Sequence, residues 1–276
     1  EIIRHAETIS GVTAGQLLSG LDFRPATGKL YSLGYDTSNG NAQLYTINRN
    51  TGVATAVNAI PVTLQLGKGK IGFDFNPAVD RIRVTGSNNA NYRLHPETGV
   101  VVAIDGNLAY AGTDVNAGTD PSVGTVAYTK SYIGSSATVL YNYDDSLNIL
   151  TRQIPPNSGT LNTVGNSGIS VNLSDPSTDL DIYFNPSNMS DAAYFSANTG
   201  SSVNDYLYSI DLNTGAATSI GMIGYGCAIK DIAAQIIMQK AGAVSGQLIY
   251  AINNSNMLIS FDSDMPLAIR SSKSVS

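Results

Sequence analysis

Charged residues are scarce in this sequence. They make up 13% of its 276 residues, about half the usual share of a soluble domain. The net charge of −6 supplies no basic surface for nucleic acid or anionic lipid, and no apolar run approaches the roughly 18 residues of a membrane span. We therefore expect no nucleic acid as a partner and no membrane-spanning segment.

The residue types that carry most enzymatic chemistry are also few. Two histidines do not suffice for a zinc cluster, and a single cysteine, Cys227, cannot form an internal disulfide. A glycosidase needs a protonated acid beside a second carboxylate. Glu1 and Glu7 lie near the N-terminus and Glu97 lies in an expected turn, so only a pair of aspartates is left for that role. We expect no enzymatic activity and no cofactor, with a glycosidase as an open alternative.

What the chain has is a repeat of about 50 residues. The string Leu21–Ala26 (LDFRPA) recurs as Phe73–Ala78 (FDFNPA) and as Ile182–Ser187 (IYFNPS). Phe23 and Phe75 are 52 residues apart, and further steps of that size fall near Tyr128, Phe184 and Ile236. Each phenylalanine is expected to pack between neighbouring repeats, and each proline to end a strand. Five such periods fill the chain.

Each period accommodates four short strands. In the first, alternation and turn residues place them at 19–24, 29–35, 43–48 and 53–58. The strings Leu44–Gly52, Tyr92–Gly99 and Leu207–Gly215 each read as a strand that ends in a glycine-containing turn. This arithmetic predicts an all-β fold, a β-propeller of about five four-stranded blades. We expect one domain over residues 1–276, with a last blade built from 229–276.

Aspartates accompany the repeated phenylalanine. Asp22 and Asp74 precede it directly in two copies, whereas Tyr183 takes that place in the third copy with Asp181 two residues earlier. Asp231 is the candidate counterpart in the fifth period. Such carboxylates either accept backbone N–H bonds from a turn or surround a cation or water at the propeller axis.

Two further groups of residues suggest ligands. Asp114, Asn116 and Asp120 offer the oxygen ligands that calcium prefers, although their spacing lacks the order of an established calcium loop. Tyr132 and Tyr225 are candidates for stacking on a glycan. We keep calcium as a possible ligand and glycan as a possible partner.

Strings along nearly the whole chain resemble one known family. They are Gly20–Gly28, Lys29–Tyr35, Leu44–Gly52, Gly72–Arg83, Asp105–Tyr110, Asp114–Pro121 and Pro155–Leu161. The chain resembles domain of unknown function 4394, a family of secreted and surface proteins of bacteria without an established activity. The resemblance implies a propeller-like fold and an extracellular or cell-surface location. Members usually begin with a segment similar to Gln247–Ser263, so this chain looks permuted or cut from a tandem array.

The two ends of the sequence resemble each other. Residues 3–10 (IRHAETIS) align with 269–276 (IRSSKSVS), and both precede the same position in the blade cycle. We interpret the chain, which starts at Glu1 without Met, as a mature or excised fragment. The residues expected to form the two competing strands are Ile3, Arg4, Thr8, Ile9, Ile269, Arg270, Ser274 and Val275.

Two strands for one outer position in the last blade suggest three outcomes. One strand is given to a neighbouring copy, which produces a head-to-tail filament, or the chain continues in a tandem array, or one end frays. We therefore expect an extracellular structural or assembly module whose partners are copies of itself or tandem neighbours. The alternative is a propeller that binds a glycan or another surface ligand.

Overall fold

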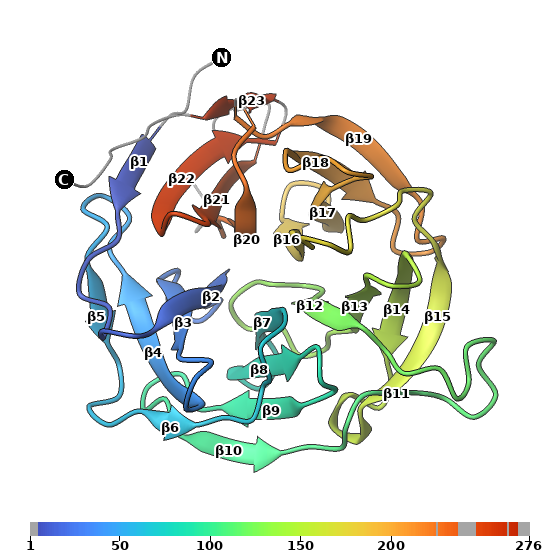
Figure 1. Ribbon diagram of the computed structural model, residues 1–276, viewed down its shortest axis with the longest axis horizontal. Coiled ribbons are helices and arrows are strands. Elements are labelled where there is room, and N and C mark those ends of the chain that lie inside the picture. The colour runs from blue at the N-terminus through green and yellow to red at the C-terminus, as the bar shows by residue number, and fades with distance from the viewer. Residues whose placement is uncertain (1–4, 225, 237–246, 264, 270–276) are drawn as a thin grey trace.

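Five small sheets stand in a ring around one axis (Figure 1). This computed structural model describes residues 5–224, 226–236, 247–263 and 265–269. Within these ranges the helical content is one 3-10 turn, η1 (Pro156–Ser158), and no helix is long and apolar enough to cross a membrane. The structure confirms the predicted all-β, five-bladed propeller.

Each blade starts with an innermost strand beside the axis and proceeds outward by antiparallel pairing (Figure 1). The first blade has β2 (Leu17–Phe23), β3 (Leu30–Tyr35), β4 (Asn41–Ile47) and β5 (Ala54–Ala56), with β6 (Val62–Thr63) also paired to β4. The second has β7 (Ile71–Asn76), β8 (Arg81–Gly86), β9 (Asn91–Leu94) and β10 (Val101–Ile104). The third has β12 (Val123–Tyr128), β13 (Leu140–Asp144), β14 (Ile149–Gln153) and β15 (Thr160–Asn166), with β11 (Ala109–Tyr110) parallel to β15.

The remaining two blades include the strands nearest the chain ends. The fourth has β16 (Thr178–Asn185), β17 (Ser190–Asn198), β18 (Asp205–Ile210) and β19 (Ala217–Met222). The fifth has β20 (Ile229–Ala234), β21 (Leu248–Asn253) and β22 (Met257–Asp262), and its outer positions hold β1 (His5–Thr8) and β23 (Met265–Ile269). In the first blade, the observed strands match the four predicted ones to within a few residues.

The repeated turns explain why the strands end where they do. At Asn48 the side chain accepts the Asn50 N–H at 3.0 Å, and the Gly52 N–H returns to the Asn48 carbonyl at 2.8 Å. Gly52 has a φ of 68°, a backbone conformation that favours glycine. The matching turn after β18 has the same bonds, since Asp211 accepts the Asn213 N–H at 2.7 Å. The sequence echo therefore marks a recurring turn geometry.

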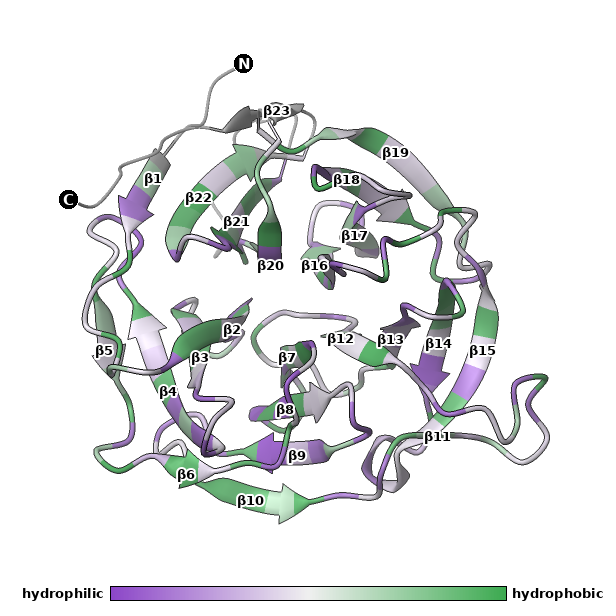
Figure 2. Ribbon diagram, in the orientation of Figure 1, coloured by the Kyte–Doolittle hydropathy of each residue, from purple (hydrophilic) through white to green (hydrophobic). Residues whose placement is uncertain are grey.

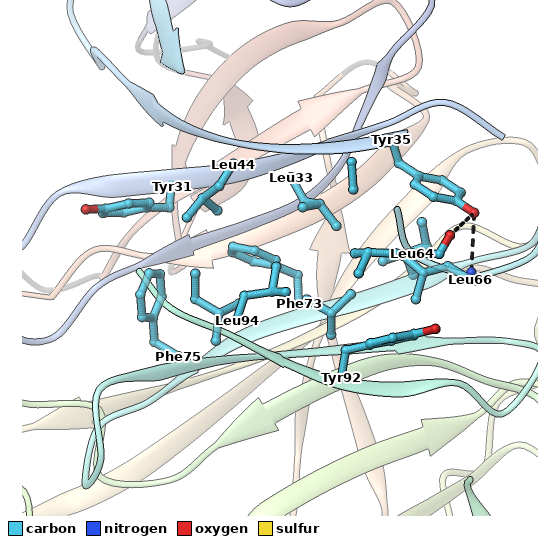
Figure 3. Close-up of a cluster of buried hydrophobic side chains, with 14 residues drawn as sticks. Tyr31, Leu33, Tyr35, Leu44, Leu64, Leu66, Phe73, Phe75, Tyr92 and Leu94 are labelled. Atoms are coloured by element: carbon cyan, nitrogen blue, oxygen red, sulfur yellow. Dashed lines mark hydrogen bonds between the residues drawn. The ribbon is translucent and has the colours of Figure 1, made fainter. Parts of the chain in front are cut away.

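Apolar side chains fill the spaces between blades. Figure 3 shows one such layer, between the first and second blades. In it Tyr31 of β3 packs edge to face on Phe75 of β7, with ring centroids 5.2 Å apart. Phe23 has the same relation to Tyr250 of the preceding blade, at 5.6 Å. The predicted packing of the repeated phenylalanines between blades is thus correct for Phe23 and Phe75. At the rim, β10 is apolar (Figure 2), and Ile104 there is exposed.

Candidate functional site

Carboxylates on the innermost strands join neighbouring blades around the axis. Asp22 on β2 accepts the N–H of Phe75 on β7 at 2.8 Å. Asp74 on β7 in turn accepts the N–H of Tyr128 on β12 at 3.1 Å. Both aspartates are buried, so their carboxylates take the place of water as acceptors for these backbone N–H groups. The aspartates do accept backbone N–H groups, as one alternative predicted, but the donors lie on the next inner strand and not in a turn.

The fourth blade follows the same register with one change. Asp181, and not Tyr183, is the counterpart of Asp22, because its carboxylate accepts the N–H of Ala234 on β20. The strand β16 is two residues longer than β7, which places its Asn-Pro turn farther from the carboxylate. The residue before Ala234 is an alanine, so the fifth blade has no carboxylate in this row. The expectation that Asp231 fills the fifth place is therefore wrong by two residues.

A second row of polar side chains lies two residues earlier on the same strands. Asp179 Oδ2 accepts the N–H of Ile232 at 2.9 Å. The hydroxyl of Thr125 donates to Asp179 Oδ1 at 2.6 Å and accepts the Leu180 N–H at 2.7 Å. Asp231 belongs to this row, and its Oδ1 is buried without a hydrogen-bond partner. The axis is thus held together by two layers of polar contacts between blades.

Three carboxylates from three blades converge at the axis. One oxygen each of Asp22, Asp74 and Asp181 lies within 4.8 Å of the other two. Burial, followed by repulsion from neighbouring carboxylates, raises the pKa of Asp22 and of Asp74 well above its ordinary value. Burial is also the main reason that the pKa of Asp181 rises to about 7. Such a cluster is stabilised either by bound protons or by a cation.

Hydrogen bonds limit what this cluster offers a metal. Both oxygens of Asp22 and both oxygens of Asp181 already accept backbone N–H groups. Asp74 Oδ1 accepts the Tyr128 N–H, whereas no hydrogen bond from the described residues reaches its Oδ2. The arrangement is suited to sharing protons among neighbouring carboxylates, and the expectation of a cation or water at the axis stays a prediction.

Lys70 is the cation that faces the buried carboxylates. It precedes β7, and its ammonium donates to the carbonyl oxygens of Thr178 and, at 3.2 Å, of Lys230. Burial raises the pKa of Asp145 to about 6, and the nearby Lys70 charge opposes that rise. Burial likewise raises the pKa of Asp205 to about 6, with Lys70 among the opposing influences. A single lysine therefore reaches across three blades and partly neutralises their carboxylates.

The predicted calcium residues are only partly brought together. Asp114 accepts the N–H and the hydroxyl of Thr163, at 2.6 and 2.7 Å, and the N–H of Asn116 at 2.9 Å. Asp120 instead accepts the side-chain amide of Asn89 at 2.6 Å. These bonds fasten the loop to β15 and to the β8–β9 turn. Calcium at this loop stays a prediction.

The predicted assembly residues fall at the edge of the fifth blade. Thr8 is the last residue of β1 and pairs with Met257, and Ile9 after it is buried. Ile269 is the last residue of β23 and pairs with Phe261 on the same strand β22. The other five predicted residues, Ile3, Arg4, Arg270, Ser274 and Val275, lie outside the described residues.

Among the residues considered in the sequence, His95, Tyr132 and Cys227 have contacts that hold a turn or pack side chains. His95 accepts the Glu97 N–H at 3.2 Å within its turn. Tyr132 lies against Phe184, with ring centroids 4.4 Å apart, and Tyr225 is outside the described residues. Cys227 is a half-buried free thiol whose pKa is raised by burial. None of these contacts supplies a nucleophile activated by a neighbouring base.

Sequence reasoning missed a buried arginine in the second blade. Arg83 on β8 is almost fully buried and donates to Asp105 at 2.6 Å, to Asn157 at 2.8 Å and to the Tyr128 hydroxyl at 3.2 Å. Arg93 contacts the same Asp105 carboxylate at 2.7 Å. The only sequence signal was an arginine between two branched apolar residues, Ile82 and Val84. Its contacts connect the second blade to the third.

Comparison with solved structures gives propellers and other chains at low identity. Glutaminyl cyclase of Myxococcus xanthus is 11% identical to this chain, with a TM-score of 0.44. The alignment covers 72% of this chain and 75% of the cyclase. The Dos1 propeller is 15% identical, with a TM-score of 0.43, and the alignment covers 95% of this chain and 60% of the Dos1 chain. A chain of a nidogen/laminin complex is 11% identical, with a TM-score of 0.48, and the alignment covers 86% of this chain and 89% of that one. No curated protein matches the sequence.

One family model matches most of the chain. The match covers residues 1–233, which include four complete blades and most of β20. It bears out the resemblance carried by the repeated strings. The chain belongs to the family described as Domain of unknown function (DUF4394).

Proposed function

We propose that this domain is an extracellular structural module whose copies join head to tail by exchanging a terminal strand. One observation supports the proposal above the others. Two strands from opposite parts of the sequence share one edge of β22: β1 pairs with Met257–Ser260, and β23 pairs with Phe261–Asp262. Both strands thus pair within their own chain, one after the other along this edge, which corrects the expectation that only one of them has a place there.

The register places the two strands on consecutive parts of β22, so they would compete only if β23 were extended. β23 runs antiparallel to β22, and its last residue, Ile269, lies opposite Phe261. A strand that continued in this direction would next reach Ser260, Ile259 and Leu258. Those are the residues with which β1 pairs. Residues 3–10 resemble residues 269–276 in sequence, and we take this similarity as support for a shared role of the two segments at this edge.

In the proposed assembly, β1 of one copy leaves its own β22 and pairs with β22 of the next. The pairing is that of strand addition, in which backbone hydrogen bonds give affinity and alternate side chains give specificity. Ala6 is the side chain of β1 that is almost fully buried, packed in the cluster that contains Ile259 and Phe261. Donor and acceptor surfaces differ, so contacts repeat in one direction and produce a filament unless they close a ring.

Composition and family support an extracellular location. The surface relies on Asn, Ser, Thr and Gly where most soluble domains use charged residues, and the resemblance is to secreted and surface proteins of bacteria. A tandem array of such domains would place the same strand through a covalent connection. In both arrangements, the partner of the domain is another copy of the same fold.

The test measures assembly of the full chain and of a variant that lacks residues 1–10, by light scattering and negative-stain microscopy. We expect head-to-tail assemblies from the full chain and monomers from the truncated one. Ala6→Asp should have the same effect, because it places a carboxylate at a buried position of the strand. Thr55→Asp, on the exposed part of β5, is the matched control and should assemble normally. Unchanged assembly of the truncated chain would contradict the proposal.

A further inference from the structure

A pocket of about 350 Å³ opens where the innermost strands begin. Its walls come from the starts of β2, β7 and β20 and from the segment before β16, so four blades contribute to it. Its volume lies in the range of pockets that hold small molecules. The residues that decide its character are Leu17, Lys68, Lys70, Ile71, Asp175 and Lys230. Three cations and one carboxylate therefore surround a partly apolar space.

The ammonium of Lys70 is already occupied. It donates to the carbonyl oxygens of Thr178 and Lys230, and its charge acts on the buried carboxylates of Asp145 and Asp179. Lys70 therefore lines the pocket while its charge acts on the buried carboxylates of the interior. Lys68 and Lys230 are the other two lysines that a ligand in the pocket would meet.

Lys230 is different, because its charge has no partner among the described residues. It lies on β20 at the wall of the pocket and is half-buried. Burial first, and the neighbouring Lys70 charge second, lower its pKa below the ordinary value of 10.5. Asp175 is the one carboxylate among the lining residues of the pocket, and within the described chain it forms no ion pair with Lys230. A half-buried ammonium without a counter-ion beside an open pocket is a site for an anion.

We propose that this pocket binds a small organic anion whose carboxylate or phosphate group pairs with Lys230. Lys68, which is exposed at the entrance, adds a second positive charge, and Leu17 and Ile71 offer an apolar surface to the body of the ligand. Among the described residues that line the pocket, none has an aromatic side chain on which a neutral sugar ring would stack. Charge is therefore the main basis of recognition, in a chain whose net charge is otherwise negative.

The site is independent of the proposed assembly. Its lining includes residues of the innermost strands β2, β7 and β20. The strands β1 and β23 lie at the rim of the fifth blade (Figure 1). A truncated chain without residues 1–10 should bind the anion as the full chain does. Failure of strand exchange and failure of anion binding are thus separate results.

The experiment is an NMR titration of the full chain with D-galacturonate, with inorganic phosphate, and with D-galactose as the uncharged match of the first. We expect at least one anion to shift the backbone amides of Ile71, Ile229 and Lys230, while galactose leaves them unchanged. Lys230→Met keeps the apolar stem and should weaken binding about tenfold or more, since a charge-assisted contact is lost. Lys29→Met removes an exposed lysine that is absent from the pocket lining, and should bind as the wild type does.

The outcomes separate two ligand sources. Binding of galacturonate alone indicates a carboxylate ligand such as an acidic sugar, and binding of phosphate alone indicates a phosphate ester. The proposal is overturned if neither anion binds at about 10 mM, a concentration that detects even weak millimolar affinity. It is also overturned if galactose binds as tightly as galacturonate, or if Lys230→Met binds normally with an unchanged melting temperature.

Discussion

Replacing Arg83 with alanine should destabilise the domain more than any change to the neighbouring Arg93. The Arg83 side chain is 1% exposed and has hydrogen bonds to Asp105, Asn157 and the Tyr128 hydroxyl. Its removal leaves polar groups of two blades without their shared donor. Breaking a buried ion pair by removing one partner costs about 3–5 kcal/mol. Because Asp105 keeps Arg93, we expect a loss near the lower end, about 3 kcal/mol.

The matched control is Arg93→Ala, which removes the other partner of Asp105. The Arg93 side chain is 28% exposed, so water replaces much of what is lost, and we expect a cost of about 1 kcal/mol. Urea unfolding followed by tyrosine fluorescence measures both, since the chain has 15 tyrosines and no tryptophan. For a chain near this size, about 3 kcal/mol corresponds to a melting temperature lower by roughly 6–12 °C.

A third variant separates lost charge from lost volume. Arg83→Met keeps most of the apolar stem and should still be clearly less stable than the wild type, because Asp105 and Asn157 lose the same donor. Equal costs for Arg83→Ala and Arg93→Ala would refute the reasoning. Full stability of Arg83→Met would show that packing, and not the ion pair, accounts for the effect.

Three further predictions concern the axis. The folded-state pKa of Asp181 is raised to about 7 from 3.8, so the stability from its bound proton is complete below pH 3.8 and is lost as pH rises through about 7. The melting temperature should therefore be higher at pH 5 than at pH 8, and a melting temperature that does not change with pH would contradict this. Asp74→Asn should raise the melting temperature at pH 8, because it removes one of the crowded charges while its amide oxygen still accepts the Tyr128 N–H; a lower value would favour a cation at the cluster. Gly72→Ala should cost about 1–3 kcal/mol in urea unfolding, because the added Cβ would come 3.0 Å from the backbone of Thr125 in the next blade; an unchanged midpoint would show that the blades can separate without cost.

Local signals explain why the fold was accessible from the sequence. The turn from Asn48 to Gly52 specifies its own geometry through a side-chain acceptor and a glycine with positive φ. After β18 the acceptor is Asp211, and the turn again ends in Asn-Thr-Gly. Alternation along each strand depends only on near neighbours in sequence. A period near 50 residues then fixes the number of blades. None of this requires knowledge of which distant residues meet.

The axis was harder to predict, because its contacts depend on register between blades. Asp181 replaces Tyr183 as the counterpart of Asp22 only because β16 is two residues longer than β7. Lys70 stands in a loop with no pattern around it, yet it reaches carbonyls more than 100 residues away in sequence. Asp105 stood out only as the first residue of the string Asp105–Tyr110, whereas it is the partner of two arginines. One-dimensional spacing contains no information about these meetings.

The irregularity of the repeat at the axis has a physical cause. A perfect repeat would place five aspartates in one row, each only a few ångströms from its neighbours in a buried environment. Three aspartates are present in this row. Burial first, and repulsion from neighbouring carboxylates second, raise the pKa of Asp22 and of Asp74 well above its ordinary value. Two more buried carboxylates in this row would add repulsion to that which already acts on these aspartates. In the third and fifth blades this row has Ala127 and Ala233 in place of aspartate. Further carboxylates lie in the second row, where Lys70 opposes the rise in the pKa of Asp179. The departures from the repeat are thus where the ring balances its own charge.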